Sequence, residues 1–143
     1  MRSTFIPSSL YANLHVDFLK SIYYNAKKQK GDDMEISATE KNNAVILSVK
    51  GRMDAVTSPQ FDKAFSEQIA KGNRSFLLSM DNLDYISSAG LRSILAAAKQ
   101  LKEKQGVILF AGLHGAVEEV FKISGFYSIF QVFVSEEDAL QHL

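Results

Sequence analysis

The amino-acid sequence predicts an α/β fold: a mixed, largely parallel sheet of about five strands, with an N-terminal antiparallel hairpin and flanking helices. Short apolar runs bounded by polar turns recur along the chain, as at 75–80 and 107–111, and predict buried strands. Stretches of about 10–15 residues with apolar side chains at helical spacing separate the later runs, which favours parallel βαβ units. The length of 143 residues fits one ordinary domain with a short extension.

The composition excludes several classes of function. The 16 basic residues are balanced by 16 acidic ones, so no net charge attracts nucleic acid or an anionic membrane. The chain has no cysteine, and therefore no disulfide, thiolate metal site or cysteine nucleophile. No apolar run approaches the ~20 residues that span a bilayer, and the N-terminal part lacks the apolar core of a signal peptide. We therefore expect a cytoplasmic protein.

Residues 1–33 differ from the rest and are expected to form an extension in front of a domain at 34–143. Apolar residues repeat every four positions in this part, which predicts an amphipathic helix over about 8–27 followed by a polar linker. The repeating positions are Leu10, Leu14, Phe18 and Ile22. This helix would pack on the domain or against a second copy of the chain. A third option is that Met34 is the true start and that the extension comes from an over-long reading frame.

An antiparallel hairpin is expected at the start of the domain. The alternation of apolar and polar residues over 34–38 predicts a half-exposed strand, and the β-branched run at 44–49 predicts a more buried one. The lysine and two asparagines at 41–43 are turn-forming residues. Residues 51–54 are expected to form a loop after the second strand.

The first helix of the domain is expected to begin at Ser58 and to end at Gly72. Serine is a preferred N-cap, Pro59 suits the first helical position, and glycine commonly follows the last one. The residues of its predicted buried face are Phe61, Ala64, Phe65 and Ile69. A buried strand is expected to follow at 75–80.

A strand-to-helix junction at 84–92 is the centre of the predicted domain. Apolar residues after Ser88 recur on one helix face to about Gln105, and Gly106 is expected to close this helix. Ser87 or Ser88 therefore lies in the N-cap region, where a serine accepts a hydrogen bond from an unpaired backbone N–H. Capping is the ordinary role for both serines, and a chemical switch is the alternative.

The remaining pattern completes the sheet. The continuous apolar run at 107–111 predicts a strand covered on both faces. A short helix ending at Gly125 and a fifth strand from 129 to 134 follow. Residues 135–138 are expected to cap a last short helix, because acidic side chains in a first turn complement the positive end of the helix dipole.

The motifs of common enzyme classes are missing. The chain has neither a G-x-x-x-x-G-K-[ST] nor a G-x-G-x-x-G loop, and Ser88 is not in a G-x-S-x-G turn. His15, His114 and His142 lie far apart and lack the spacing of metal ligands. His114 is expected in a loop before a helix, solvated or capping. We therefore expect a non-catalytic domain without metal or cofactor.

Asp54, Asp81 and Asp84 are expected in loops at strand ends. Functional groups of an open α/β sheet gather at the carboxyl ends of its strands, so these aspartates and Ser88 are predicted on one edge. Turn or capping chemistry is the alternative role of each aspartate.

Residues 81–91 resemble the signature of STAS domains, the family of anti-sigma factor antagonists. In that family a strand ends in an acidic segment, which is followed by an aromatic residue. A serine then stands at the start of a long helix, shortly before a Gly-Leu pair. Residues 51–54 resemble that family's Gly-x-Leu-Asp loop, 116–126 its helix ending in Ser-Gly-Phe, and 135–140 its closing segment. The resemblance covers residues 34–143 and implies the STAS fold.

The resemblance also implies roles for individual residues. In this family a partner kinase phosphorylates the serine two residues before the motif glycine, which is Ser88 here. The family's aspartate in the loop after the second strand, which is associated with that reaction, corresponds to Asp54. Directly before the phosphorylated serine the family often has another aspartate; here that position is Ser87, which is a secondary candidate for phosphorylation. The residues expected at the partner surface are Asp54, Tyr85, Ile86, Ser87, Ala89, Gly90, Leu91 and Arg92.

The implied function is a phosphorylation-regulated partner switch. With Ser88 unmodified, the chain would bind an anti-sigma factor that is also a serine kinase, and so free a sigma factor; a phosphatase would restore this state. We expect a monomer or weak dimer without direct contact to nucleic acid. The alternative keeps the fold but makes the chain an accessory subunit of a transporter or stress-signalling assembly, with residues 1–33 as a docking element.

Overall fold

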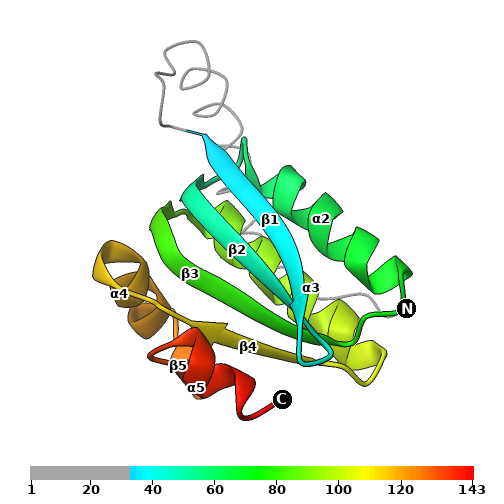
Figure 1. Ribbon diagram of the computed structural model, residues 1–143. Helices are drawn as coiled ribbons and strands as arrows, with labels where there is room; N and C mark the ends of the chain where they lie inside the picture. The colour runs from blue at the N-terminus through cyan, green and yellow to red at the C-terminus, as the bar shows by residue number, and fades with distance from the viewer. Residues whose placement is uncertain (1–32) are drawn as a thin grey trace.

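A computed structural model describes residues 33–143 of the chain (Figure 1). The predictions for residues 1–32, including the amphipathic helix, lie outside the described residues. The described elements are, in chain order, β1 (Met34–Lys41), β2 (Ala44–Met53), α2 (Ser58–Ala70), β3 (Ser75–Ile86), α3 (Ser88–Glu103), β4 (Val107–Ala111), α4 (Gly115–Ile123), the 3₁₀ turn η1 (Phe126–Ser128), β5 (Gln131–Phe133) and α5 (Glu136–Leu140).

The strands form one sheet in the order β1-β2-β3-β4-β5. β1 and β2 are antiparallel, whereas β2 to β5 are parallel to one another. The connections between the parallel strands pass through helices, as parallel pairing requires. The predicted mixed sheet with an N-terminal antiparallel hairpin is therefore confirmed.

The β1–β2 hairpin turns through the two asparagines that the sequence placed there. Asn42 and Asn43 have φ angles of 55° and 64°, and a tight turn of type I′ needs positive φ at both positions. The resulting register pairs Met34 with Gly51. The beginning of β1 thus lies beside the end of β2, at the edge where the parallel strands end.

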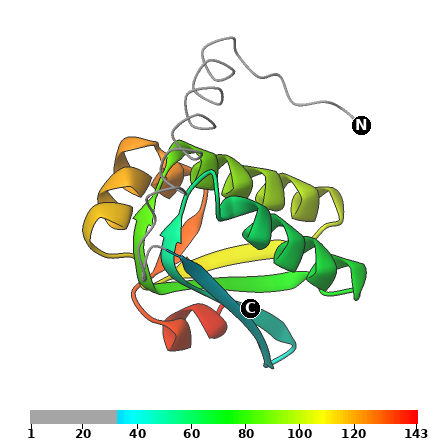
Figure 2. The ribbon, with the colours of Figure 1, turned by 90° about the horizontal axis from the view of Figure 1, so that it is seen from above.

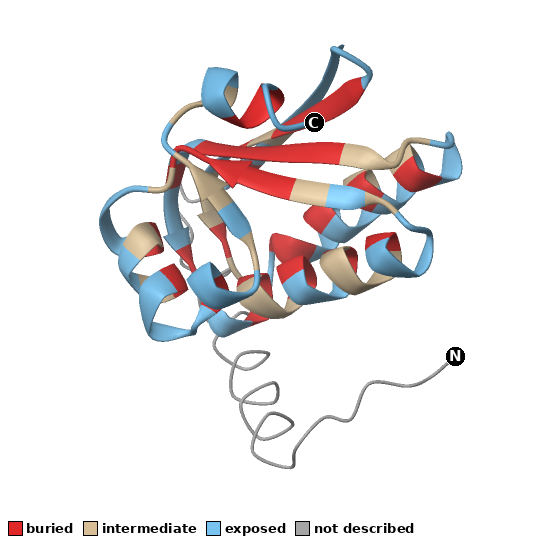
Figure 3. Ribbon diagram, turned by 90° about the horizontal axis from the view of Figure 1, so that it is seen from below, coloured by how far each residue is buried: buried red, intermediate tan, exposed pale blue. Residues whose placement is uncertain are grey.

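Helices cover the two faces of the sheet unequally (Figure 2). α2, α3 and α4 lie on one face, over the larger apolar core, which includes Phe65, Phe76 and Phe110. α5 covers the other face, where Ala139 and Leu140 pack with residues such as Leu77 and Leu109. Buried positions therefore fill both sides of the central strands (Figure 3), as their continuous apolar character predicted.

β2 and β3 are longer than predicted, so the expected loops at 51–54 and 81–84 are wrong in part. β2 continues to Met53, and residues 82–86 of β3 pair with its end. Register shifts after Ser48 and after Gly51 interrupt the alternation of side chains between the two faces of the sheet. That alternation is the pattern by which a strand is recognised in a sequence. Asp81 and Asp84 consequently lie on a strand and not in loops.

The N-cap of α2 differs from the prediction by one residue, and α3 ends at Glu103, about two residues before the predicted end. α2 has Thr57 and not Ser58 at the N-cap position. After α3, Gln105 and not Gly106 has the left-handed conformation, with a φ of 62°. A Cβ on Gly106 would lie 2.5 Å from the Arg74 carbonyl oxygen, so this glycine is required for close packing and not for a positive φ.

The fifth strand is shorter than predicted. The expected strand from 129 to 134 is confined to Gln131–Phe133, and the 3₁₀ turn Phe126–Ser128 precedes it. Phe126 and Phe130 pack with ring centroids 5.3 Å apart, which holds the chain in this turn. The aromatic contact within the turn outweighs the β propensity of the apolar residues that follow Gly125.

Candidate functional site

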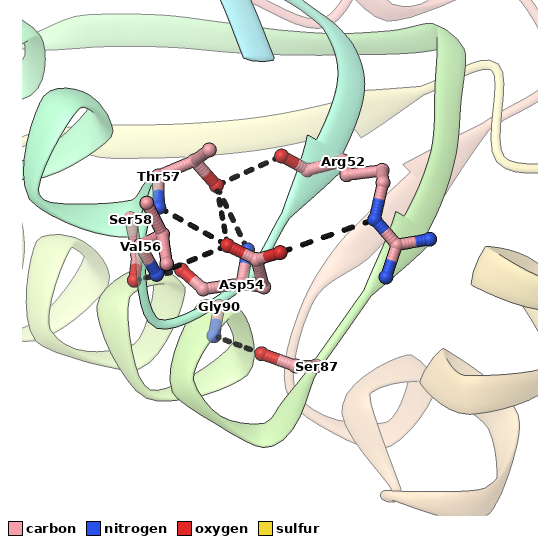
Figure 4. Close-up of polar contacts among 7 residues, drawn as sticks. All are labelled: Arg52, Asp54, Val56, Thr57, Ser58, Ser87 and Gly90. Carbon is pink, nitrogen blue, oxygen red and sulfur yellow. Dashed lines mark hydrogen bonds and ion pairs between the residues drawn. The ribbon is translucent and has the colours of Figure 1, made fainter. Parts of the chain in front are cut away.

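The candidate site lies where β2 and β3 end side by side. Parallel pairing sets Arg52 opposite Tyr85 and Met53 opposite Ile86. The next residue along β2 is Asp54, and the backbone N–H of Ser87 donates to the Met53 carbonyl oxygen at 2.9 Å. The loop that leads into α2 and the turn that leads into α3 are thus held together. Figure 4 shows the polar contacts within each of these two segments.

The carboxylate of Asp54 organises the loop before α2. Its Oδ1 accepts hydrogen bonds from the backbone N–H of Val56 at 3.0 Å and of Thr57 at 3.1 Å. The buried Thr57 hydroxyl donates to the Arg52 carbonyl oxygen at 2.8 Å and accepts from the Asp54 N–H at 2.9 Å. The Ser58 hydroxyl donates to the Asp54 carbonyl oxygen. The Asp54 carboxylate therefore satisfies the backbone N–H groups of the loop that leads into α2.

The Arg52 side chain joins this loop to β3. Its Nε lies 3.9 Å from Asp54 Oδ2, and its guanidinium carbon lies 4.0 Å from the centre of the Tyr85 ring. The Arg52 and Asp54 side chains are 26% and 17% exposed. A pair at this distance and exposure contributes about 0–1 kcal/mol, so its role is to orient the carboxylate and the ring.

Ser87 is the N-cap of α3, and Ser88 is its first helical residue. The Ser87 hydroxyl accepts from the Gly90 backbone N–H at 3.4 Å, and its carbonyl oxygen accepts from the Leu91 N–H at 2.9 Å. Ser87 is half-buried, whereas Ser88 is exposed. Of the two serines, Ser87 has the capping role and Ser88 is the more exposed residue.

Gly90 allows α3 to approach β2 closely. A Cβ at this position would lie 2.8 Å from the Met53 carbonyl oxygen and 2.7 Å from a side-chain carbon of Ile86. Real Cβ atoms essentially never come so near, so any larger residue would push the start of α3 away from Met53. This glycine sets the position of Ser88 relative to Asp54.

Some of the residues predicted at the partner surface are accessible, and others are buried. Tyr85 is 37% exposed, and Leu91 and Arg92 are half-buried, so these three are accessible to a partner. Ile86 and Ala89 are 3% and 8% exposed, and Gly90 is buried as well. The buried three act on the site by positioning its backbone. Their low exposure follows because the first turn of α3, which contains Ala89 and Gly90, packs on Ile86 and Met53.

Asp81 and Asp84 do not join the cluster around Asp54. Asp84 is exposed on β3, next to Tyr85. The Asp81 carbonyl oxygen lies 2.6 Å from His114 Nε2, and its side chain lies next to Gly112. His114 is thus at the N-cap position of α4 but bonds across to β3 instead of capping the helix. Of the three predicted aspartates, only Asp54 accepts hydrogen bonds in the loop that leads into α2.

Sequence reasoning did not single out Arg52, Thr57 or Val56 as site residues. Thr57 is one residue before the predicted helix start, and an Asp-x-x-Thr spacing at a helix start is a local signal that could have identified it. Arg52 had no such signal, because its contact with Tyr85 depends on the β2–β3 register.

The residues that the structure describes were searched for grouped metal ligands and for membrane-spanning helices. Within residues 33–143 no three His, Cys, Asp or Glu side chains are grouped so that they could hold a metal ion. No helix among these residues is long and apolar enough to cross a membrane.

Replacing Asp54 by alanine is expected to lower the free energy of unfolding by about 1–2 kcal/mol, because the backbone N–H groups of Val56 and Thr57, in the loop before α2, lose their acceptor. Asparagine keeps an Oδ1 acceptor and should lower it by less than about half that amount. Urea titrations followed by circular dichroism would compare the two variants. Equal losses would show that the charge of Asp54, and not its hydrogen bonds, stabilises the loop.

Comparison with known proteins gives the family. The sequence model of the STAS domain matches residues 35–139. A protein described as a candidate anti-sigma factor antagonist, BtrV of Bordetella bronchiseptica, is 40% identical over 106 residues, which are 74% of this chain and 91% of that protein.

Two solved structures have the same fold. An anti-sigma factor antagonist from Mycobacterium paratuberculosis has a TM-score of 0.73 at 19% identity and covers 80% of this chain and 97% of its own. The Bacillus cell fate determinant SpoIIAA in its phosphorylated form has a TM-score of 0.62 at 18% identity and covers 76% of this chain and 98% of its own. Because the sequence model of this family matches most of the described residues, the chain belongs to the STAS domain family, which includes the anti-sigma factor antagonists.

Proposed function

We propose that this protein is an anti-sigma factor antagonist whose partner binding is controlled by phosphorylation of Ser88. In the unmodified state it binds an anti-sigma factor that is a serine kinase, and the sigma factor is set free in the cytoplasm. The kinase transfers the γ-phosphoryl group of ATP to Ser88 Oγ, the hydroxyl proton leaves with a base of the kinase, and ADP is released. A phosphatase reverses the modification.

The observation that carries this proposal is the placement of Ser88. It is exposed at the first residue of α3, beside a surface formed by the Asp54 loop and Tyr85. The 40% identity with BtrV supports the same class of partner. Ser87 is a poorer acceptor, because its hydroxyl is half-buried and accepts from the Gly90 N–H.

The physics of a helix start suits a phosphoserine at this position. A phosphate group adds nearly two negative charges and three acceptor oxygens. The start of a helix favours an anion, because its first backbone N–H groups are unpaired and the positive end of the helix dipole lies there. The domain should therefore remain folded after modification. A partner interface that buries Ser88 would have to desolvate the dianion, at a cost of several kcal/mol, and binding would be lost.

The role is one of binding and not of catalysis by this chain. Thr57, Val56 and Arg52 engage the Asp54 carboxylate. The site thus offers a phosphate acceptor and a contact surface. Asp54 is suited to orient a cationic group of the kinase or to fix the loop that meets it.

Affinity capture from native lysate tests the proposal, with wild type, Ser88→Ala and Ser88→Glu as baits. Wild type and Ser88→Ala are expected to retain an ATP-binding serine kinase that Ser88→Glu loses. The captured kinase with ATP should add one phosphate to wild type and to Ser87→Ala, and none to Ser88→Ala, by intact-mass measurement. Capture of the same membrane or scaffold proteins by all three baits would instead favour an accessory-subunit role.

A further inference from the structure

β1 is an edge strand of the sheet. The strand order places it at one end, next to β2, and among residues 33–143 no strand pairs with its outer side (Figure 1). All of its last five residues, from Ser37 to Lys41, are exposed. The outer side of an edge strand presents a row of backbone N–H and C=O groups that can pair with another strand.

β1 lacks the features by which many edge strands avoid such pairing. Natural edge strands are commonly very short, or they carry a proline or a bulge. β1 has eight residues without a proline, and its register with β2 is uninterrupted from Met34 opposite Gly51 to Lys41 opposite Ala44. Its charged residues have both signs, so no uniform charge repels a second strand.

The register identifies the backbone groups that face the outer side. Opposite residues of an antiparallel pair alternate between hydrogen-bonded and non-hydrogen-bonded pairs. Continued by one residue, the β1–β2 register sets Asp33 opposite Arg52, whose N–H donates to the Asp33 carbonyl oxygen at 3.3 Å. Odd-numbered residues of this segment therefore bond to β2. The even-numbered Ile36, Ala38 and Glu40 direct their N–H and C=O groups to the outer side.

β1 is complementary to a second copy of itself. In an antiparallel pair with a twofold axis at Ala38, Ile36 lies opposite Glu40 of the second copy and Ala38 lies opposite its own counterpart. Only groups on the outer side are used, and they form about six backbone hydrogen bonds. On the other face of the sheet Glu35 lies opposite Lys41 of the second copy, and the twofold axis makes this pair twice. Cross-strand pairs of opposite charge stabilise a sheet.

We propose that two copies of this chain associate through their β1 strands, so that two five-stranded sheets become one continuous sheet. Only a sheet edge is buried, so the interface is small and the association is reversible. The Asp54 loop and Ser88 follow β2 and β3 and form no part of this interface. The association is therefore independent of the proposed function.

Shifted registers fit less well. Residues with outward-facing groups must pair with one another, so a shift moves the strand by two residues. One shift brings Lys41 opposite Asp33 but sets the Glu40 carboxylate opposite Met34, which is 4% exposed and belongs to the apolar core. The opposite shift leaves Glu35 beyond the paired strand. In both cases the two Glu35–Lys41 pairs are lost.

Sedimentation of the full chain at rising concentration tests the association. The weight-average mass is expected to rise from 15.9 kDa toward twice that value. Lys41→Glu makes both charge pairs repulsive and should weaken the dimer at least about fivefold. Lys104→Glu makes the same change of charge at an exposed residue after α3 and should leave the dimer unchanged. Ser88→Glu should also leave it unchanged, which separates this proposal from the proposed switch.

Exchanging the two charges checks that Glu35 and Lys41 lie opposite each other. Glu35→Lys alone should weaken the dimer as Lys41→Glu does. The double variant restores opposite charges in exchanged positions and should dimerise within about twofold of wild type. Because Glu35→Lys also places a lysine opposite Lys50 of the same chain, a thermal melt confirms that each variant is folded. A double variant as weak as the single ones would contradict the pairing.

Disulfide formation locates the twofold axis. The chain has no cysteine, so each introduced thiol is the only one in its copy. Ala38→Cys should oxidise to a covalent dimer, because the Cα atoms of a hydrogen-bonded pair lie about 5.5 Å apart, within the range of a disulfide. Ser37→Cys and Thr39→Cys should each remain monomeric alone and link to one another when mixed, since these positions lie opposite each other in the proposed register.

Three results would overturn the proposal. A mass that stays at 15.9 kDa up to a concentration of about 1 mM would exclude the dimer. If the amides of Ile36, Ala38 and Glu40 were then protected from hydrogen exchange, another segment of the same chain would cover the edge. Homodimers of Ser37→Cys or Thr39→Cys would assign a shifted register. Equal linkage of all three cysteine variants would indicate random collision.

Discussion

Replacing Ser88 by glutamate is expected to weaken binding of the captured anti-sigma factor at least 100-fold, while the melting temperature stays within about 3 °C of wild type. The loss in affinity corresponds to about 2.7 kcal/mol or more. It arises because a charge placed on the exposed first residue of α3 must be desolvated when the partner covers it. The small thermal effect arises because a carboxylate is favourable in the first turn of a helix.

Ser88→Gln is the matched control, because glutamine has nearly the same size as glutamate and no charge. It should weaken binding by less than about tenfold if charge is the cause, and as much as glutamate if bulk is the cause. Isothermal titration calorimetry with the purified partner measures both affinities, and a calorimetric melt measures stability. A melting temperature lower by more than about 8 °C in Ser88→Glu would contradict the argument that the helix start tolerates a negative charge.

Gly90→Ala is expected to lower the free energy of unfolding by about 1–3 kcal/mol, because the added methyl group would overlap the Met53 carbonyl oxygen and the Ile86 side chain. Helix propensity alone predicts the opposite sign, since alanine is up to about 1 kcal/mol more favourable than glycine inside a helix. The sign of the change therefore decides between the two effects. For a domain of this size, the expected loss lowers the melting temperature by several degrees.

The same substitution should weaken partner binding beyond its effect on stability. The contact between Gly90 and Met53 holds the start of α3 against the Asp54 loop, so the clash displaces Ser88 relative to Asp54. Binding measured well below the melting temperature, where the variant is folded, separates the two effects. A raised melting temperature together with unchanged affinity would show that β2 and α3 adjust to a side chain at this position without cost.

Several features of the site were predictable because they depend on local patterns. A serine ahead of an apolar helical repeat indicates a helix start, and α3 does begin at Ser88 with Ser87 as its cap. Aspartate at the end of a strand, shortly before a helix, indicates a capping loop, and Asp54 accepts hydrogen bonds from Val56 and Thr57. The roles of these residues in phosphorylation remain predictions.

Other features depend on contacts between distant segments and could not be predicted. The polar residues of β3 beyond Met80 form a strand only because the end of β2 pairs with them after two register shifts. The same pairing places Arg52 against Tyr85. The requirement for glycine at position 90 likewise arises from the Met53 carbonyl oxygen, which belongs to the neighbouring strand.

The sequence by itself determined the order of strands and helices, the asparagine turn at 42–43 and a helix start at Ser87 or Ser88, because hydrophobic periodicity and turn propensity act over a few residues. Only the tertiary structure decided which side chains meet: it joins Arg52, Asp54, Tyr85 and Ser87 where β2 and β3 end, and it places Asp81 with His114 beside the end of β4. The physical reason is that strand register and close packing depend on the partner segment, whose contribution no local pattern contains.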